Sequence, residues 1–275
     1  YIKTKSGETY FEDDNGQPWR CLHYVANSIC HQQVERPEQF YQSALSFGHF
    51  LKQLGDYPAE SLYETIPQFH DTVKRLRDFK DAQRKDVKNR ARKCKPEIEF
   101  VLSREDDCGV LMKQLEEGKL PLRVTHNDTK LNNILFDADT DEGLCIIDLD
   151  TIMPGLAAND FGDSIRFGAS TAEEDEPDLD KVHFDINLYD IYTKGYLEMA
   201  KDVLTSAEIA SLPWGARLMT LECGMRFLAD YLQGDVYFKT AYPEHNLVRA
   251  RTQFRLVKEM EEQFDQMNEI LKKYI

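Results

Sequence analysis

Hydrophobic positions along the chain form short β-like runs near the start and helical spacings later. Thr9–Phe11 is a β-prone run, the turn residues Asp13–Gly16 follow it, and Trp19–Val25 is a second β-prone run. Such runs around a turn are typical of paired strands. The pattern therefore predicts two strands, followed by a hinge at Ala26–Ser28.

After Pro37 the spacing becomes helical. Apolar residues recur every three or four positions up to Gly55, which predicts a helix: Phe40, Ala44, Phe47, Leu51 and Leu54. Residues 67–118 predict further helices, interrupted near Pro96 and Gly109. From about residue 160 the pattern is again helical and ends in an amphipathic stretch between Leu247 and Leu271.

Three short apolar runs interrupt the helical pattern: Leu122–Thr125, Ile134–Phe136 and Leu144–Ile147. The last two flank the acidic, turn-rich segment Asp137–Gly143, which predicts a β-hairpin. The predicted fold class is therefore α+β. A mostly helical lobe carries a short β-hairpin insert and follows a small β-rich segment.

Composition narrows the function classes. The 275 residues are 41% hydrophobic, contain no apolar run of membrane-spanning length, and carry a formal charge of −15. This charge disfavours nucleic acid and anionic membranes as partners. The six cysteines show no metal-site or disulfide spacing, and no signal peptide precedes them, so we expect a soluble, cytoplasmic protein. Its oligomeric state stays open.

The motif that carries chemistry is His126-x-Asp128-x-x-x-x-Asn133, with an apolar run on each side and Asp148 following the second predicted hairpin strand. Phosphoryl transfer needs a carboxylate that accepts the acceptor's hydroxyl proton, and amide and carboxylate oxygens that hold Mg²⁺. Asp128 fits the first role, and Asn133 and Asp148 fit the second. We expect His126 to brace the loop.

Three other acidic patterns are interpreted structurally. Asp160-Phe161-Gly162 matches the metal-binding motif of protein kinases, but it does not follow an apolar strand. We therefore expect Asp148 to be the better metal ligand. Asp137-x-Asp139-x-Asp141 resembles the start of a calcium loop, but its glycine is misplaced and its flanks are strands. It is interpreted as a solvated hairpin turn, and Glu173–Glu176 as a solvated loop.

The segments around these motifs resemble the aminoglycoside phosphotransferase and choline kinase-like superfamily: Thr125–Asn133, Ile146–Gly155 and Asp160–Asp163. Residues from the hinge onward look most like bacterial N-acetylhexosamine 1-kinases. The resemblance implies a two-lobed protein kinase-like fold and phosphorylation of the anomeric hydroxyl of GlcNAc or GalNAc by ATP and Mg²⁺. It implies Asp128 as the catalytic base and Asn133 and Asp148 as magnesium ligands. Asp150 would support this site, and Asp163 a structural polar network.

The resemblance also implies an acceptor site. Glu222–Arg226 and Gly234–Tyr237 resemble family segments that line it, so Arg226 and Tyr237 are expected to contact the sugar, with Thr151 and Phe167 near them. The structural alternative, in which Arg226 pairs with a helix carboxylate and Tyr237 packs in the core, stays open.

No Gly-rich phosphate loop and no strand lysine can be placed in residues 1–25. By resemblance, residues 1–27 are the last two strands of the N-terminal lobe plus the hinge, and residues 28–275 are the helical lobe. The backbone of Tyr24 and Val25 would contact the nucleotide. Because the chain begins with Tyr1 and not Met, we expect it to start inside a longer protein, and we expect the chain alone to fold but to transfer phosphate poorly.

Two other functions remain open. The acceptor could be another small alcohol such as an aminoglycoside or choline, or the chain could be a non-catalytic, pseudokinase-type binding module. The presence of Asp128, Asn133 and Asp148 together argues against the second.

Overall fold

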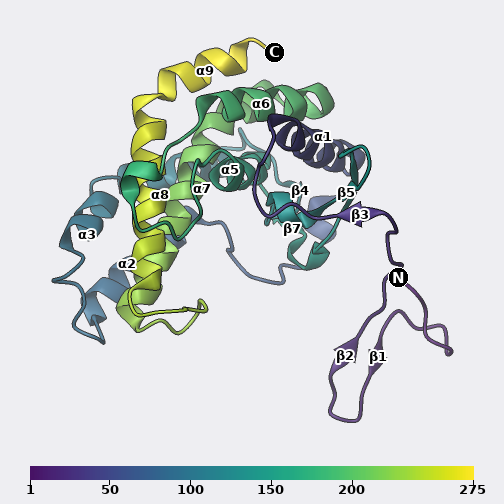
Figure 1. Ribbon diagram of the computed structural model, residues 1–275, viewed down its shortest axis with the longest axis horizontal. Helices are drawn as coiled ribbons and strands as arrows, with labels where there is room; N and C mark the ends of the chain where they lie inside the picture. Colours follow the sequence, from purple (N-terminus) through teal and green to yellow (C-terminus); the bar gives the residue numbers. More distant parts are fainter.

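The computed structural model describes all 275 residues. The first strands are β1 (Phe11–Glu12) and β2 (Pro18–Trp19), an antiparallel pair that projects away from the helical body (Figure 1). The Asp13 carboxylate closes their turn by accepting hydrogen bonds from two backbone N–H groups and from the Trp19 indole.

The predicted second strand is shorter than expected. Beyond Trp19 only Cys21 pairs, through an isolated bridge to Ile2, and residues 22–25 have no strand partner. A strand needs a neighbour to satisfy its backbone groups, so the β-prone sequence alone does not extend it.

Helices, with the 3₁₀ turns included, make up about 52% of the residues, in agreement with the predicted mostly helical lobe. The helices are α1 (Pro37–Gln53), α2 (Thr72–Lys85), α3 (Lys95–Leu102), α4 (Val110–Glu116), α5 (Ala157–Gly168), α6 (Ile186–Ala200), α7 (Ser206–Gln233), α8 (His245–Glu262) and α9 (Phe264–Lys272). Pro37 occupies the first turn of α1, where its missing N–H costs nothing. The amphipathic C-terminal stretch forms two helices that break at Gln263.

The remaining strands form two small sheets: β3 (Ser28–Ile29), β4 (Arg123–Thr125), β5 (Ile134–Asp137), β6 (Gly143–Ile146) and β7 (Met153–Gly155). In one sheet the strand order is β3-β5-β6, and in the other β4 pairs with β7. The predicted hairpin is the antiparallel pair β5–β6, and the Asp137 carboxylate accepts two backbone N–H groups within its turn.

Helices α5 and α7 cross at unusually close range in the centre of the body (Figure 1). A Cβ atom added to Gly162 would lie 2.2 Å from the carbonyl oxygen of Gly215, and one added to Gly215 would lie 1.9 Å from that of Ala158. Only glycine permits this contact. It fixes α5, whose N-terminal turns lie under the candidate site.

No helix combines the length and the apolar composition required to cross a membrane.

Candidate active site

The His-x-Asp loop connects β4 to a 3₁₀ turn at Leu131–Asn133, which leads directly into β5. Val124 and Leu131 are buried on either side of the loop, so apolar anchors hold both ends. Asn127 has a φ of 63°, a left-handed conformation that asparagine tolerates better than most residues. The apolar–loop–apolar sequence pattern thus produces a sharply bent loop with fixed ends.

Two carboxylates in the N-terminal turns of α5 accept hydrogen bonds from the backbone of the loop. The Asp160 carboxylate accepts the backbone N–H groups of His126 and Asn127, both at 2.8 Å. The Asp163 carboxylate accepts the N–H of Thr129 at 3.0 Å and a guanidinium N–H of Arg166 at 2.8 Å. Asp160 therefore supports the loop, and the expected structural role of Asp163 is confirmed.

Burial and charge act differently on these two carboxyl groups. Burial raises the pKa of Asp160 to about 6, against the opposing effect of the His126 charge and the two N–H donors. Burial acts in the same direction on Asp163, but the charges of Arg166 and Lys130 outweigh it and hold the pKa of Asp163 below its ordinary value of 3.8.

His126 ties the loop to the segment that carries Asp148. Its Nε2 donates to the carbonyl oxygen of Ile147 at 2.9 Å, and its ring packs edge-on against Phe47 and Phe50 of α1. The side chain is fully buried. The expected bracing role of His126 is therefore confirmed.

Asp128 is half-buried in the middle of the loop, and both of its carboxylate oxygens have a partner. Oδ2 accepts from the amide of Asn133 at 3.0 Å, and Oδ1 lies 2.8 Å from Lys130 Nζ. The same Asn133 amide nitrogen donates to the Asp128 carbonyl at 2.7 Å. Since both partners are acceptors, the NH₂ group of Asn133 must face Asp128, and its Oδ1 is left without a protein partner.

The β5–β6 hairpin brings Asp148 next to Asn133. Ile134 pairs with Ile146, and the Ile147 N–H donates to the Asn133 carbonyl at 2.9 Å, so Asp148 is the next residue beyond that bond. The Asp148 carboxylate is exposed and makes no hydrogen bond or ion pair within the protein.

These free oxygens fit a magnesium ion. No cluster of three or more His, Cys, Asp or Glu side chains that could bind a metal exists in the chain. Mg²⁺, however, is commonly held by one or two protein oxygens plus substrate phosphates, so Asn133 Oδ1 and Asp148 are the residues that would hold it here. Asp150 is less available, since it forms an ion pair with Arg20.

The predicted hinge lies beside the far end of β5. Ser28 pairs with Asp137, which is four residues, or roughly 13 Å of strand, from Asn133. Tyr24 is 86% exposed, and the Val25 carbonyl accepts a hydrogen bond from the Ser28 hydroxyl.

Arg226 and Tyr237 lie together on one cavity of about 340 Å³ between α2 and α7. The Arg226 guanidinium lies over three aromatic rings, 5.1 Å from Phe69, 5.5 Å from Phe238 and 5.9 Å from Tyr237. It makes no ion pair, contrary to the structural alternative of a helix carboxylate partner. Arg75 lines the same cavity, and burial followed by the charge of Arg226 lowers its pKa.

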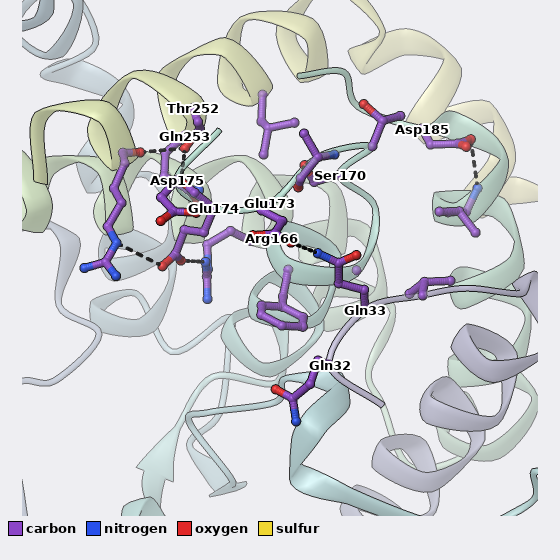
Figure 2. Close-up of a pocket in the computed structure, with 18 residues that line it drawn as sticks. Gln32, Gln33, Arg166, Ser170, Glu173, Glu174, Asp175, Asp185, Thr252 and Gln253 are labelled. Carbon is purple, nitrogen blue, oxygen red and sulfur yellow. Dashed lines mark hydrogen bonds and ion pairs between the residues drawn. The ribbon is translucent and has the colours of Figure 1, made fainter. Parts of the chain in front are cut away.

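The structure does not bring the other two predicted acceptor residues into this cavity. The Thr151 hydroxyl donates to the His126 carbonyl at 2.7 Å, beneath the catalytic loop. Phe167 lines a different cavity, of about 570 Å³ (Figure 2). It packs against a small buried cluster made of Phe47, Leu131, Ile134 and Phe136.

The interpretation of Glu173–Glu176 as a merely solvated loop is wrong. Figure 2 shows Glu173, Glu174 and Asp175 around the larger cavity, where Glu174 pairs with buried Arg166 at 2.8 Å. Asp175 pairs with His245 at 2.9 Å. The partner cations are far away in sequence, so the acidic run alone does not reveal these contacts.

Sequence reasoning also missed Lys130, Arg75 and His70. Lys130 lies inside the motif, and its spacing of two from Asp128 is a usable signal. His70 bonds both to Glu222 and to the Asn127 carbonyl, across separations of 152 and 57 residues. No local pattern signals such contacts.

The comparisons with known proteins agree with this geometry. The Phosphotransferase enzyme family matches residues 9–196. Among solved structures, the chain resembles a microcompartment-associated aminopropanol kinase, with 15% identity, a TM-score of 0.57, and coverage of 97% of this chain and 75% of that one. It resembles the choline kinase of Cryptosporidium parvum Iowa II equally, with 15% identity, a TM-score of 0.57, and coverage of 96% and 76%. A Plasmodium vivax ethanolamine kinase matches at 12% identity and a TM-score of 0.50, over 89% of this chain and 66% of that one.

At these identities the structural likeness shows the fold alone, which is kinase-like, as predicted. The family match is stronger evidence, because it covers more than half of the residues and includes the His-x-Asp loop, Asn133 and Asp148. The chain therefore belongs to the Phosphotransferase enzyme family.

Proposed function

We propose that the protein is a Mg²⁺- and ATP-dependent kinase that phosphorylates the anomeric hydroxyl of an N-acetylhexosamine. The observation that carries the phosphoryl-transfer part is the arrangement of Asp128, Asn133 and Asp148. One carboxylate is fixed in orientation, and two further oxygens beside it have no protein partner.

The chemistry follows from these positions. Asp128 accepts the proton of the acceptor hydroxyl while the hydroxyl oxygen forms a bond to the γ-phosphorus of ATP, and the bond from that phosphorus to the bridging oxygen of ADP breaks. Asn133 and Lys130 keep the carboxylate pointed at the acceptor. Asn133 Oδ1 and Asp148 would hold Mg²⁺, which when bound neutralises phosphate charge.

The two units of the chain take separate roles in this proposal. Residues 1–27 form the end of an N-terminal lobe with its hinge, and residues 28–275 form the helical lobe. Tyr24 and Val25 would contact the nucleotide, and β5 leads from this hinge toward the metal oxygens.

The sugar assignment rests on the resemblance of Asp148–Gly155 and on the cavity of Arg226 and Tyr237. An aromatic wall beside a hydrogen-bond donor suits a sugar ring. Thr151 and Phe167 stay proposed contacts of the sugar. Because neither residue lines this cavity, the sugar would have to extend beyond it to touch them.

A second candidate is an amino-alcohol kinase, because three of the similar structures are kinases of aminopropanol, choline and ethanolamine. The charge of the cavity does not separate the two candidates, because three cationic and three anionic side chains line it: Arg75, Lys85, Arg226, Asp78, Asp81 and Asp230. The preference for a sugar therefore rests on the resemblance and on the aromatic wall.

The test is an acceptor panel with the intact protein, ATP and Mg²⁺. GlcNAc and GalNAc are compared with glucose, choline, ethanolamine and aminopropanol, and ³¹P NMR locates the new phosphate. We expect N-acetylhexosamines to exceed the amino alcohols about 100-fold in kcat/KM and to carry the phosphate on the anomeric oxygen. Preference for an amino alcohol would overturn the sugar assignment. Absence of turnover with every acceptor would favour a binding module.

A further inference from the structure

His70 forms a buried link between α7 and the catalytic loop. It precedes α2, and its Nδ1 lies 2.9 Å from Glu222 Oε1 while its Nε2 lies 3.0 Å from the Asn127 carbonyl oxygen. The His70 side chain is 7% exposed and that of Glu222 is 1% exposed. The other Glu222 oxygen accepts from the Thr72 hydroxyl at 2.8 Å.

The two partners determine where the protons are. A backbone carbonyl can only accept, so Nε2 of His70 carries a hydrogen. Nδ1 faces a carboxylate, and it donates a second hydrogen when Glu222 is ionised. The ring is then an imidazolium with both N–H groups bonded, and the buried carboxylate has the opposite charge that a low-dielectric site requires.

The surrounding charges favour this ionised pair. The charged groups that act on the pair from the packed elements are Arg75 of α2, Asp160 and Asp163 of α5, and Arg226 of α7. Burial alone would lower the pKa of His70, but the hydrogen bond and charge of Glu222 raise it above its ordinary 6.5. Burial acts to raise the pKa of Glu222, but His70 and then Arg226 hold it below its ordinary 4.5.

The link acts on the peptide group next to the proposed base. The Asn127 carbonyl and the Asp128 N–H belong to one peptide, and the only hydrogen bond on that peptide is the one from His70. Asn127 itself has a left-handed φ of 63°, so this peptide lies at the bend of the loop. The Asp128 side chain is bonded separately, by Asn133 and Lys130.

We propose that His70, as an imidazolium paired with Glu222, is a positioning residue that orients the Asn127–Asp128 peptide for phosphoryl transfer. This role rests on the proposed function of Asp128. It also links the loop to α7, where Arg226 lies one turn beyond Glu222.

The test compares His70→Phe and Glu222→Gln with His183→Gln in the intact protein. His183 also pairs with a glutamate, Glu259, but it is 47% exposed and lies outside the site, so it is a matched control. We expect His70→Phe to lower kcat about 10- to 100-fold with the KM for ATP little changed, since small misplacements of reacting groups have effects of this size. Hydrogen exchange across residues 126–130 should become faster.

The pH profile separates positioning from a merely structural role. The kcat of the wild type should fall as the pH rises through the raised pKa of His70, and Glu222→Gln should move this limb to lower pH, while His183→Gln leaves it in place. An unchanged limb in Glu222→Gln would overturn the proposal, even if His70→Phe does not fold.

The protonation state can be measured without turnover. ¹⁵N NMR of the histidine rings should show both nitrogens of His70 protonated at neutral pH, and a neutral ring would also overturn the proposal. The two proposals can fail separately. If no acceptor is phosphorylated, the proposed function fails. The link of His70 to the loop still stands in that case if His70 is doubly protonated and His70→Phe speeds hydrogen exchange across residues 126–130. If the loop is unchanged in His70→Phe, the positioning role fails as well.

Discussion

The amide of Asn133 holds Asp128 through two hydrogen bonds, 3.0 Å to its carboxylate and 2.7 Å to its carbonyl oxygen. This contact explains how one short motif can serve two tasks. The NH₂ group holds the proposed base, and the opposite oxygen of the same amide, which has no protein partner, is the proposed magnesium ligand beside Asp148. The spacing of five residues is therefore a geometric requirement, because the 3₁₀ turn brings Asn133 back to Asp128.

Asp148→Asn should weaken magnesium binding while preserving the fold. The substitution keeps the size of the side chain and removes the charge that Mg²⁺ prefers. We expect the Mg²⁺ concentration for half-maximal turnover to rise at least about 10- to 100-fold, the loss that is typical even for outer-shell changes. Asp180→Asn, on the exposed turn at Leu179–Lys181, is the control. An unaltered Mg²⁺ requirement in Asp148→Asn would remove Asp148 from the proposed ligands.

Arg226→Gln should raise the KM for the acceptor with a smaller effect on kcat. The cavity loses a guanidinium that lies over Tyr237, Phe238 and Phe69, whereas the catalytic loop keeps all of its hydrogen bonds. Steady-state kinetics with GlcNAc measure this, and Arg92→Gln, at an exposed position before α3 that does not line the cavity, is the control. An equal KM in Arg226→Gln and Arg92→Gln would place the acceptor elsewhere.

Gly162→Ala should destabilise the fold. The added Cβ would meet backbone atoms of Gly215 at 2.2 and 2.4 Å, which flexible side chains cannot relieve. Overpacking of this kind costs about 1–3 kcal/mol or more in the free energy of unfolding. Denaturant titration measures the change. Gly109→Ala is the matched control, because Gly109 has no atom within 4 Å of its Cβ position and does not require a positive φ. Equal stability of the two variants would refute the tight crossing of α5 and α7.

The ion pair of His70 and Glu222 should make stability depend on pH at both ends. Because the pKa of His70 is raised, its contribution is complete below 6.5 and is lost as the pH rises through the folded-state pKa. Because the pKa of Glu222 is lowered, its contribution is complete above 4.5 and is lost as the pH falls through the folded-state pKa. The difference in unfolding free energy between wild type and Glu222→Gln should therefore peak between pH 4.5 and 6.5. A difference that does not vary with pH would contradict the pair.

The sequence predicts those parts of the site whose contacts join residues close together in the chain. The β5–β6 hairpin and the helical spacing after Pro37 follow from period and turn chemistry, and both are observed. The spacing of Asp128 and Asn133 predicts the roles proposed for them, and it is the contact between their side chains that the structure adds. The length of a strand is harder to predict from sequence, because a strand depends on a partner elsewhere in the chain. The predicted strand Trp19–Val25, for example, is observed only at Pro18–Trp19.

The contacts that position the loop are not local. Asp160 belongs to an Asp-Phe-Gly sequence that resembles the protein kinase motif, but its hydrogen bond to the His126 N–H depends on the packing of α5 against β4. Phe167 and Arg226 likewise line different cavities, because the packing of α5 and α7 determines which cavity each side chain faces. Tertiary packing sets these relationships, and a single sequence contains no periodic signal for them.

The most direct measurement of the central claim is the turnover of Asp128→Asn with ATP, Mg²⁺ and GlcNAc in the intact protein. Asn keeps the size of the side chain and an oxygen for the Asn133 amide, but it cannot accept the hydroxyl proton. The account predicts that kcat falls about 10²- to 10⁴-fold, the typical contribution of a general base, while calorimetry shows nearly unchanged binding of nucleotide and sugar. Asp265→Asn, on the exposed first turn of α9, should retain full turnover. Near-normal turnover of Asp128→Asn would contradict the account.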